Sequence, residues 1–198
     1  THFAEQGYVV ASVGYRLLKE APYPAAIEDT KCAVRWMRAH AKELHVDPDR
    51  IAVIGGSAGA HLSMMIAYAS DIHKLEGSGG WKDTSSSVRA VVDIYGPVDL
   101  TTPYASSHKL ITSFINKPYD IAPQLYEEGS PLFHLDASDP PTLIIQGTLD
   151  DLVPVIQSDR LAERLESLGI PYWYDRIDGW PHAMDVTRPL NERVKTVV

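Results

Sequence analysis

The chain has 198 residues, 44% of them hydrophobic, and a formal net charge of −8. This is the length of one domain that can bury a core, so we interpret residues 1–198 as a single domain. The negative charge argues against nucleic acid or an anionic membrane surface as a partner. No apolar run approaches the roughly 18 residues that a membrane span needs.

The first part of the chain predicts a strand, a helix and a second strand. A short helix ends at Gly7 and is followed by a strand over 8–13, a loop over 16–24 and a helix over 24–44. The long helix places apolar side chains on one face: Ile27, Val34, Met37, Ala41 and Leu44. A strand over 51–54 and a helix over 60–69 come next. This order implies a parallel sheet with right-handed crossovers.

The second part continues the alternation with one interruption. After a surface loop over 70–87, we expect strands over 88–95, 142–146 and 172–177, and helices over 156–168 and 187–198. The segment from about 98 to 139 is aromatic and broken by four prolines. It is too long for a simple connection, so we expect it to form a small, partly helical cap.

Residues 55–59 read Gly-Gly-Ser-Ala-Gly, between the predicted strand and helix. This is the G-x-S-x-G pattern of a nucleophile elbow, which exposes a serine hydroxyl on a sharp turn. We expect a Cβ at either flanking glycine to collide with the neighbouring strand or helix. A dinucleotide loop would need G-x-G-x-x-G, but Ser57 occupies its second glycine position. Ser57 is therefore the candidate nucleophile, with a plain helix N-cap as the alternative.

A nucleophilic serine needs a base and a group that orients the base. Asp150 follows the fourth predicted strand, and His182 follows the fifth. The carboxyl ends of parallel strands meet at one edge of the sheet, which is where functional groups gather. Ser57, Asp150 and His182 thus form a candidate triad, with Asp151 and the more distant Asp99 as alternative carboxylates. We interpret His61, one turn after Ser57, as structural.

The motifs VIGGSAGAHL, QGTLDDLVP and DGWPH together resemble the α/β-hydrolase fold of esterases and lipases. Residues 15–51 also resemble bacterial carboxylesterases, and the nearest resemblance is to acetylxylan and feruloyl esterases. The resemblance implies a mostly parallel sheet with helices on both faces. It maps the catalytic acid to Asp150. A histidine of the family is replaced by Gln146, for which we expect no catalytic effect.

The same resemblance implies an H-G-G-G-type loop and further strands upstream of Thr1, and these are not in this sequence. In the family, that loop supplies backbone N–H groups to the oxyanion hole. Only the N–H of Ala58, the residue after the nucleophile, can be assigned to the hole here. Trp180, two residues before His182, is a candidate substrate-lining side chain.

We therefore expect a serine hydrolase that cleaves small or carbohydrate-linked carboxylic esters through an acyl-enzyme. No cofactor is expected, and the histidines show no metal-binding spacing such as H-E-x-x-H. A serine peptidase of the prolyl-oligopeptidase type and a non-catalytic binding module stay open as alternatives. An exposed sheet edge favours a homo-oligomer. The sequence does not indicate a cellular location.

Overall fold

The computed structural model describes residues 2–70 and 72–186. Its centre is a sheet of four strands in the order β1-β2-β3-β4, and every neighbouring pair is parallel. The strands are β1 (Ala52–Gly56), β2 (Ala90–Ile94), β3 (Thr142–Gly147) and β4 (Tyr172–Ile177). The parallel pairing confirms the predicted alternation of strands and helices. It also brings the carboxyl ends of all four strands to one edge of the sheet.

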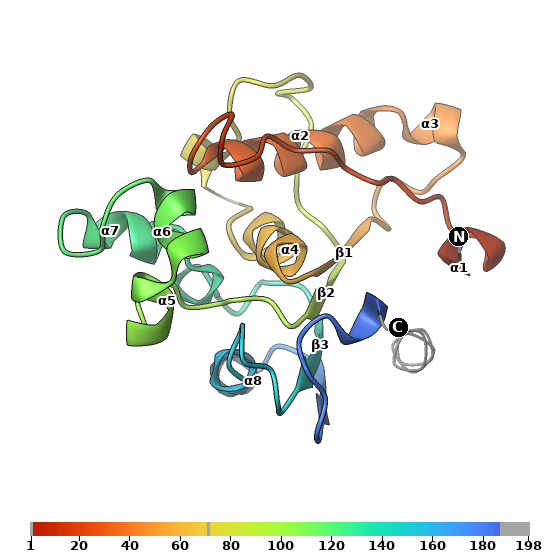
Figure 1. The fold of residues 1–198 in the computed structure, drawn as a ribbon. Coiled ribbons are helices and arrows are strands. Elements are labelled where there is room, and N and C mark those ends of the chain that lie inside the picture. The colour runs from red at the N-terminus through yellow and green to blue at the C-terminus, as the bar shows by residue number, and fades with distance from the viewer. Residues whose placement is uncertain (1, 71, 187–198) are drawn as a thin grey trace.

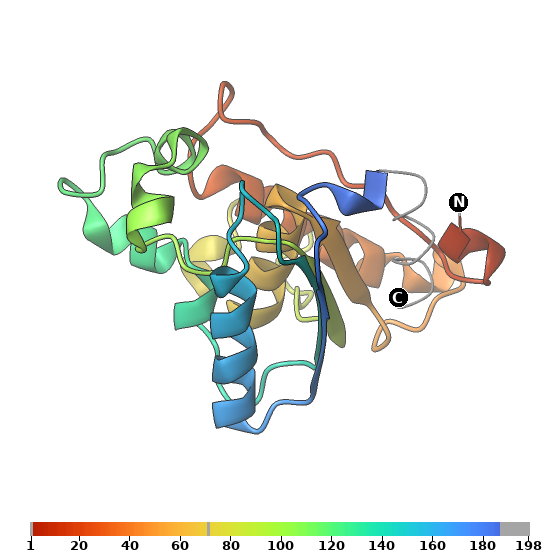
Figure 2. The same cartoon turned by 60° about the horizontal axis from the view of Figure 1, so that its bottom comes forward.

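Two helices cover one face of this sheet (Figures 1 and 2). Helices α4 (Ala58–Tyr68) and α8 (Ile156–Leu168) share a buried core with β2 and β3 that includes Met64, Leu161 and Ile144. Helix α2 (Ala25–Ala39) packs against α4 through Ile27. The period-2 pattern of the strands explains this division, since alternate side chains point to opposite faces. On the opposite face, Ile94 and Ile145 pack with Met184 of the 3₁₀ helix η3 (Met184–Val186).

Residues 98–139 form a separate layer beside the carboxyl edge of the sheet (Figure 1). The layer consists of α5 (Pro103–Ser107), α6 (Lys109–Ile115), α7 (Pro123–Glu128) and the 3₁₀ helix η2 (Pro131–Phe133). It has its own small core, which contains Leu100, Ala105, Ile111, Ile115 and Tyr126. Prolines begin α5, α7 and η2, where the missing N–H has no helical partner to lose.

The predicted strand over 8–13 is wrong. These residues follow the short helix α1 (His2–Glu5) in an irregular path, and Tyr8, Val9 and Val10 are 67%, 46% and 50% exposed. Their β-branched composition favours extended chain, but a strand also needs a neighbour that completes its hydrogen bonds. Among the described residues, β1 pairs only with β2.

The predicted helix over 24–44 is interrupted at His40. The backbone of His40 has φ −100° and ψ 14°, and a separate turn, α3 (Ala41–Leu44), follows. The carbonyl of Trp36 accepts from both the backbone N–H and the ring Nδ1 of His40, at 3.0 and 2.8 Å. The predicted loop over 70–87 contains one short 3₁₀ helix, η1 (His73–Leu75). The predicted helix over 187–198 lies outside the described residues.

Candidate active site

Ser57 lies on a tight turn between β1 and α4. Its φ of 54° and ψ of −118° are unusual for a residue with a side chain, so the turn is strained. The Ser57 N–H donates to the carbonyl of Ile94 at 2.9 Å, and its carbonyl accepts from the His61 N–H at 3.1 Å. These two bonds fix the turn to β2 and to the first turn of α4.

The two glycines of the elbow motif have different roles. A Cβ on Gly55 would lie 2.2 Å from the carbonyl carbon of Gly59, which is too close for any side chain. A Cβ on Gly59 would meet nothing within 4 Å. The expected collision therefore exists at Gly55 but not at Gly59, because the Gly55 Cα faces the α4 backbone whereas the Gly59 Cα faces open space.

The structure brings Ser57, His182 and Asp150 into one hydrogen-bonded chain. The Oγ of Ser57 lies 3.0 Å from Nε2 of His182, and Nδ1 of His182 lies 2.7 Å from Oδ2 of Asp150. The Asp150 side chain is completely buried, and that of His182 is 14% exposed. With Asp150 ionised, the ring donates from Nδ1, so Nε2 is free to accept the Ser57 proton. This is the arrangement of a nucleophile, a base and an orienting carboxylate.

Asp150 is held in place by its own loop and by β3. Its Oδ1 accepts from the N–H groups of Leu152 and Val153 at 3.0 and 2.7 Å. Burial alone would raise the pKa of Asp150, but the hydrogen bonds from His182, Val153 and Gln146 outweigh it and lower the pKa. The carboxylate therefore stays charged at neutral pH, which is the state that orients an imidazole.

The alternative carboxylates lie elsewhere. Asp151 is exposed. Asp99 pairs with Arg160 and accepts from Thr101. Neither is placed against His182 as Asp150 is. His61 is buried, which lowers its pKa to about 4, and it donates from Nε2 to the carbonyl of Gly129 at 2.7 Å. It joins α4 to the layer over 98–139 and stays neutral.

The loop that carries His182 is bound closely to the end of β3. The Oγ1 of Thr148 accepts from the Gly179 N–H at 2.9 Å and donates to Asp178 at 3.0 Å. A Cβ on Gly147 would lie 2.1 Å from the carbonyl oxygen of Trp180, so this approach requires glycine. The Trp180 side chain packs with the cluster around Ile145.

Two residues that sequence reasoning did not assign to the site contact its members. Gln146, for which we expected no catalytic effect, is fully buried and donates from Nε2 to Oδ2 of Asp150 at 3.0 Å. Tyr95 places its ring 4.5 Å from that of His182, and its hydroxyl donates to Asp185. The Gln146 position was visible in the motif, whereas nothing in the sequence connects Tyr95 with His182.

A pocket of about 290 Å³ opens beside Ser57 and Ala58. Its lining is mostly apolar. Besides residues of α2 and α4, it includes side chains from three further segments: Tyr15, Leu17 and Leu18; Leu110, Ile111 and Phe114; and Leu152 and Val153. Tyr104 of α5 also lines it. Trp180 is not among the lining residues, so its role as a substrate contact stays a prediction.

The part of the chain that the structure describes contains no cluster of three or more His, Cys, Asp or Glu side chains arranged for a metal ion. Within the same ranges, none of the helices has the length and hydropathy to cross a membrane.

Ala58, whose N–H is the candidate oxyanion donor, is exposed at the start of α4. The positive end of the α4 dipole therefore faces the pocket beside Ser57.

The parallel sheet, the strained serine turn and the loops after β3 and β4 define an α/β hydrolase. Solved structures agree with this class. A truncated carbohydrate esterase from gut microbiota superposes with a TM-score of 0.80 at 29% identity, covering 94% of this chain and 72% of that one. Esterase 2 of Thermogutta terrifontis superposes with a TM-score of 0.77 at 26% identity, covering 93% and 66%.

The family is equally clear from the sequence comparisons. The BD-FAE family model matches residues 1–165, and the chain belongs to this family. The probable carboxylic ester hydrolase LipM of Mycobacterium tuberculosis is 31% identical over 192 residues, which are 94% of this chain and 44% of LipM. An arylesterase of Saccharolobus solfataricus is 30% identical, covering 96% of this chain and 61% of that enzyme. The chain spans about half the length of LipM and of the esterase LipQ.

Proposed function

We propose that this protein is a serine hydrolase that cleaves carboxylic esters. The observation that carries the proposal is the hydrogen-bonded chain from Ser57 through His182 to Asp150, at the end of an apolar pocket. The similarity to LipM, to the arylesterase and to the carbohydrate esterase supports ester bonds as the target.

In the proposed mechanism, Nε2 of His182 accepts the Ser57 proton as Oγ attacks the ester carbonyl carbon. The N–H of Ala58 donates to the oxyanion that forms, and one such donor is worth roughly 10²–10³ in rate. His182 then protonates the leaving alcohol, which leaves an acyl group on Ser57. Water, deprotonated by His182, attacks the acyl-enzyme and releases the acid. Asp150 stays ionised throughout and stabilises the imidazolium.

The substrate is proposed as an ester with a short acyl group, carried on a small alcohol or on a carbohydrate. The apolar lining supports a neutral group in the pocket. The carbohydrate alternative is supported by the similarity to a carbohydrate esterase and by the BD-FAE family model.

Hydrolysis of p-nitrophenyl acetate by the wild type and by Ser57→Ala tests this proposal. We expect turnover by the wild type and a loss of about 10⁴-fold or more in the variant, because the nucleophile is removed. Circular dichroism should be unchanged, since a smaller side chain fits the same turn. Turnover that persists in folded Ser57→Ala would contradict the mechanism.

A further inference from the structure

The outer wall of the pocket includes residues of two segments. One is residues 15–18, here called the strap, which has no regular secondary structure. The other is α6, which contributes Leu110, Ile111 and Phe114. Leu17 of the strap and Leu110 of α6 are 60% and 59% exposed, whereas Tyr15 packs against the cluster around Ile27 and Ile111 lies in the core of the 98–139 layer. Apolar packing therefore anchors only part of this wall, and the position of Leu17 depends on polar contacts nearby.

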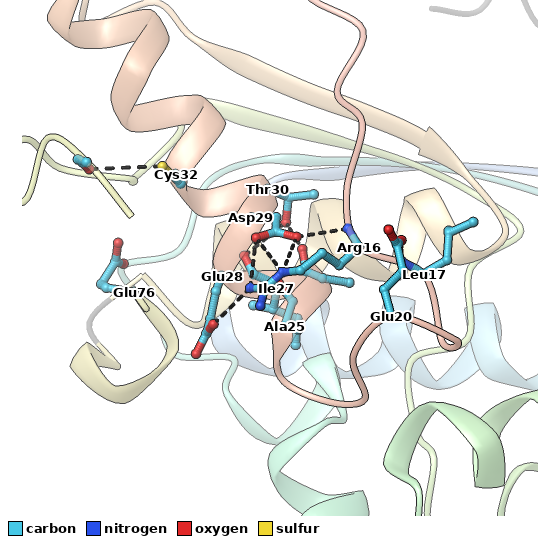
Figure 3. Close-up of polar contacts among 12 residues, drawn as sticks. Arg16, Leu17, Glu20, Ala25, Ile27, Glu28, Asp29, Thr30, Cys32 and Glu76 are labelled. Atoms are coloured by element: carbon cyan, nitrogen blue, oxygen red, sulfur yellow. Dashed lines mark hydrogen bonds and ion pairs between the residues drawn. The ribbon is translucent and has the colours of Figure 1, made fainter. Parts of the chain in front are cut away.

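Arg16 connects the strap to α2 (Figure 3). Its Nε lies 3.1 and 2.9 Å from the two carboxylate oxygens of Asp29, and one terminal nitrogen lies 2.9 Å from Oδ1. The Arg16 backbone N–H also donates to Asp29 at 2.8 Å. The same guanidinium reaches Glu28 at 3.2 Å and the carbonyl of Ala25 at 3.3 Å. We call the Arg16–Asp29 pair the clasp.

The clasp ties the strap to the framework that carries Ser57. Asp29 lies near the start of α2, and α2 packs against α4, whose first turn follows Ser57. The backbone hydrogen bonds of Leu17 stay within its own turn. Its N–H donates to the Glu20 carboxylate at 2.8 Å, and its carbonyl accepts from the N–H groups of Glu20 and Ala21 at 2.8 and 3.1 Å. Farther along, the Tyr23 N–H donates to the carbonyl of Phe114 at 2.8 Å. The clasp thus fixes the strap at Arg16, between Tyr15 and Leu17, which both line the pocket.

The clasp also explains why a pocket with an arginine in its lining can accept an apolar group. The Arg16 charge is neutralised by two carboxylates of α2. The hydrogen bonds from Arg16 lower the pKa of Asp29, so the pair stays ionised at neutral pH. The strap side chains on either side of Arg16 that face the pocket are Tyr15, Leu17 and Leu18.

We propose that the pocket binds an aliphatic chain of the ester, and that the clasp sets the accepted length of this chain by holding the strap against it. The proposal rests on the proposed ester hydrolysis and assigns Arg16 and Asp29 as positioning residues. This aliphatic chain belongs to either the acyl or the alcohol side of the ester. Both sides present the same methylene chemistry to Leu17 and Leu110.

Two series of ester substrates show whether the acyl chain or the alcohol chain enters the pocket. The first varies the acyl chain from acetate to octanoate on p-nitrophenol, and the second varies the alcohol from methyl to hexyl on acetate. In the series that enters the pocket, kcat/KM should rise about fourfold per buried methylene, the equivalent of about 0.8 kcal/mol, until the chain reaches the wall. A flat profile in both series would overturn the assignment of the pocket to an aliphatic chain.

The clasp is tested by Arg16→Ala and Asp29→Asn in the responsive series. In these variants the strap is no longer ordered before binding, so the substrate must order it at a cost in affinity. The ratio of kcat/KM for the longest accepted ester to that for the shortest ester should therefore fall about tenfold. The loss should appear mainly as a higher KM for the long esters. Arg16→Lys keeps the charge but not the two-pronged contact, so it should recover only part of the preference.

Arg176→Ala is the matched control. The Arg176–Asp159 pair has side-chain exposures of 48% and 27%, close to the 45% and 26% of the clasp, and Arg176 does not line the pocket. Its chain-length profile should equal that of the wild type. An unchanged profile in Arg16→Ala, with melting temperature preserved, would overturn the role of the clasp.

Binding to an inactive protein separates this proposal from the proposed function. In the Ser57→Ala background, which consumes no ester, calorimetry should give an about tenfold weaker affinity for the preferred long ester when Arg16→Ala is added. Equal affinities would overturn the clasp even if the wild type is an esterase. If the wild type shows no Ser57-dependent turnover but Arg16→Ala still weakens ester affinity tenfold, the hydrolytic function is overturned and the binding role of the clasp is kept.

Discussion

Ser57 lies at the inner end of the pocket and is hydrogen-bonded to His182 and through it to Asp150, whereas Leu17 and Leu110 at the outer wall are exposed. The side chain of Asp150 is fully buried and accepts from four groups, while the strap is joined to α2 chiefly through Arg16. The inner end suits chemistry that needs fixed geometry. The outer wall suits a binding surface that differs between related enzymes.

This contrast predicts that changes at the inner end act on kcat, and after Ser57→Ala the largest effect is expected at Asp150. Asp150→Asn loses the charge that stabilises the imidazolium and the tautomer of His182, so kcat/KM should fall by about 10³–10⁴. Asp151→Asn, at the exposed neighbouring carboxylate, should leave activity within twofold. Steady-state kinetics on p-nitrophenyl acetate would measure both. Equal effects of the two substitutions would mean that Asp150 is not the orienting carboxylate.

The elbow glycines give the next largest effect, and they form a natural pair. Gly55→Ala places a Cβ 2.2 Å from the Gly59 backbone, so the turn must shift. The free energy of unfolding should therefore fall by about 3 kcal/mol or more. Gly59→Ala meets open space inside a helix and should be neutral or slightly stabilising. Urea unfolding would compare the two variants. A Gly59→Ala loss as large as that of Gly55→Ala would contradict the described turn.

The smallest effect concerns Asp93, a buried carboxyl of β2 behind the elbow. Its Oδ1 accepts from the Gly96 N–H at 2.7 Å, and Oδ2 has no hydrogen-bond partner among the described residues. Burial raises the pKa of Asp93 to about 7, whereas in the unfolded chain the group ionises near pH 4. The folded protein therefore holds a proton that the unfolded chain releases, and stability falls as pH rises from about 4 to about 7.

Asp93→Asn removes this titration and keeps the acceptor for Gly96. The free energy of unfolding of the wild type, relative to the variant, should drop by about 2–3 kcal/mol between pH 5 and pH 7.5. Urea titrations of both proteins at the two pH values would measure the difference. A difference that does not depend on pH would show that Asp93 does not change its ionisation on folding.

The sequence was sufficient for the features that depend on local order. The elbow motif, the Asp after β3 and the His after β4 could be placed together because parallel strands end at one edge of the sheet. Features that depend on distant contacts could not be predicted. The apolar residues 8–13 have strand composition but no pairing neighbour in the described ranges, and the clasp joins a loop to a helix thirteen positions away.

Individual residues show the same limit. Gly55 and Gly59 look equivalent in the motif, and only the direction of each Cα distinguishes them. Gln146 was expected to have no catalytic effect, and its neighbours in the sequence do not show that its amide reaches Asp150. Tyr95 meets His182 through the positive φ of 49° that follows β2, which no local pattern predicts for a tyrosine.

The most direct measurement of the central claim is the labelling of the active serine with an alkyl fluorophosphonate, read by mass spectrometry of the digested protein. An activated Ser57 should carry one phosphonyl group per chain, on the peptide that contains residue 57, and His182→Ala should abolish the label by removing the base. Labelling at another residue, or labelling of Ser57 that is unchanged in folded His182→Ala, would contradict the account.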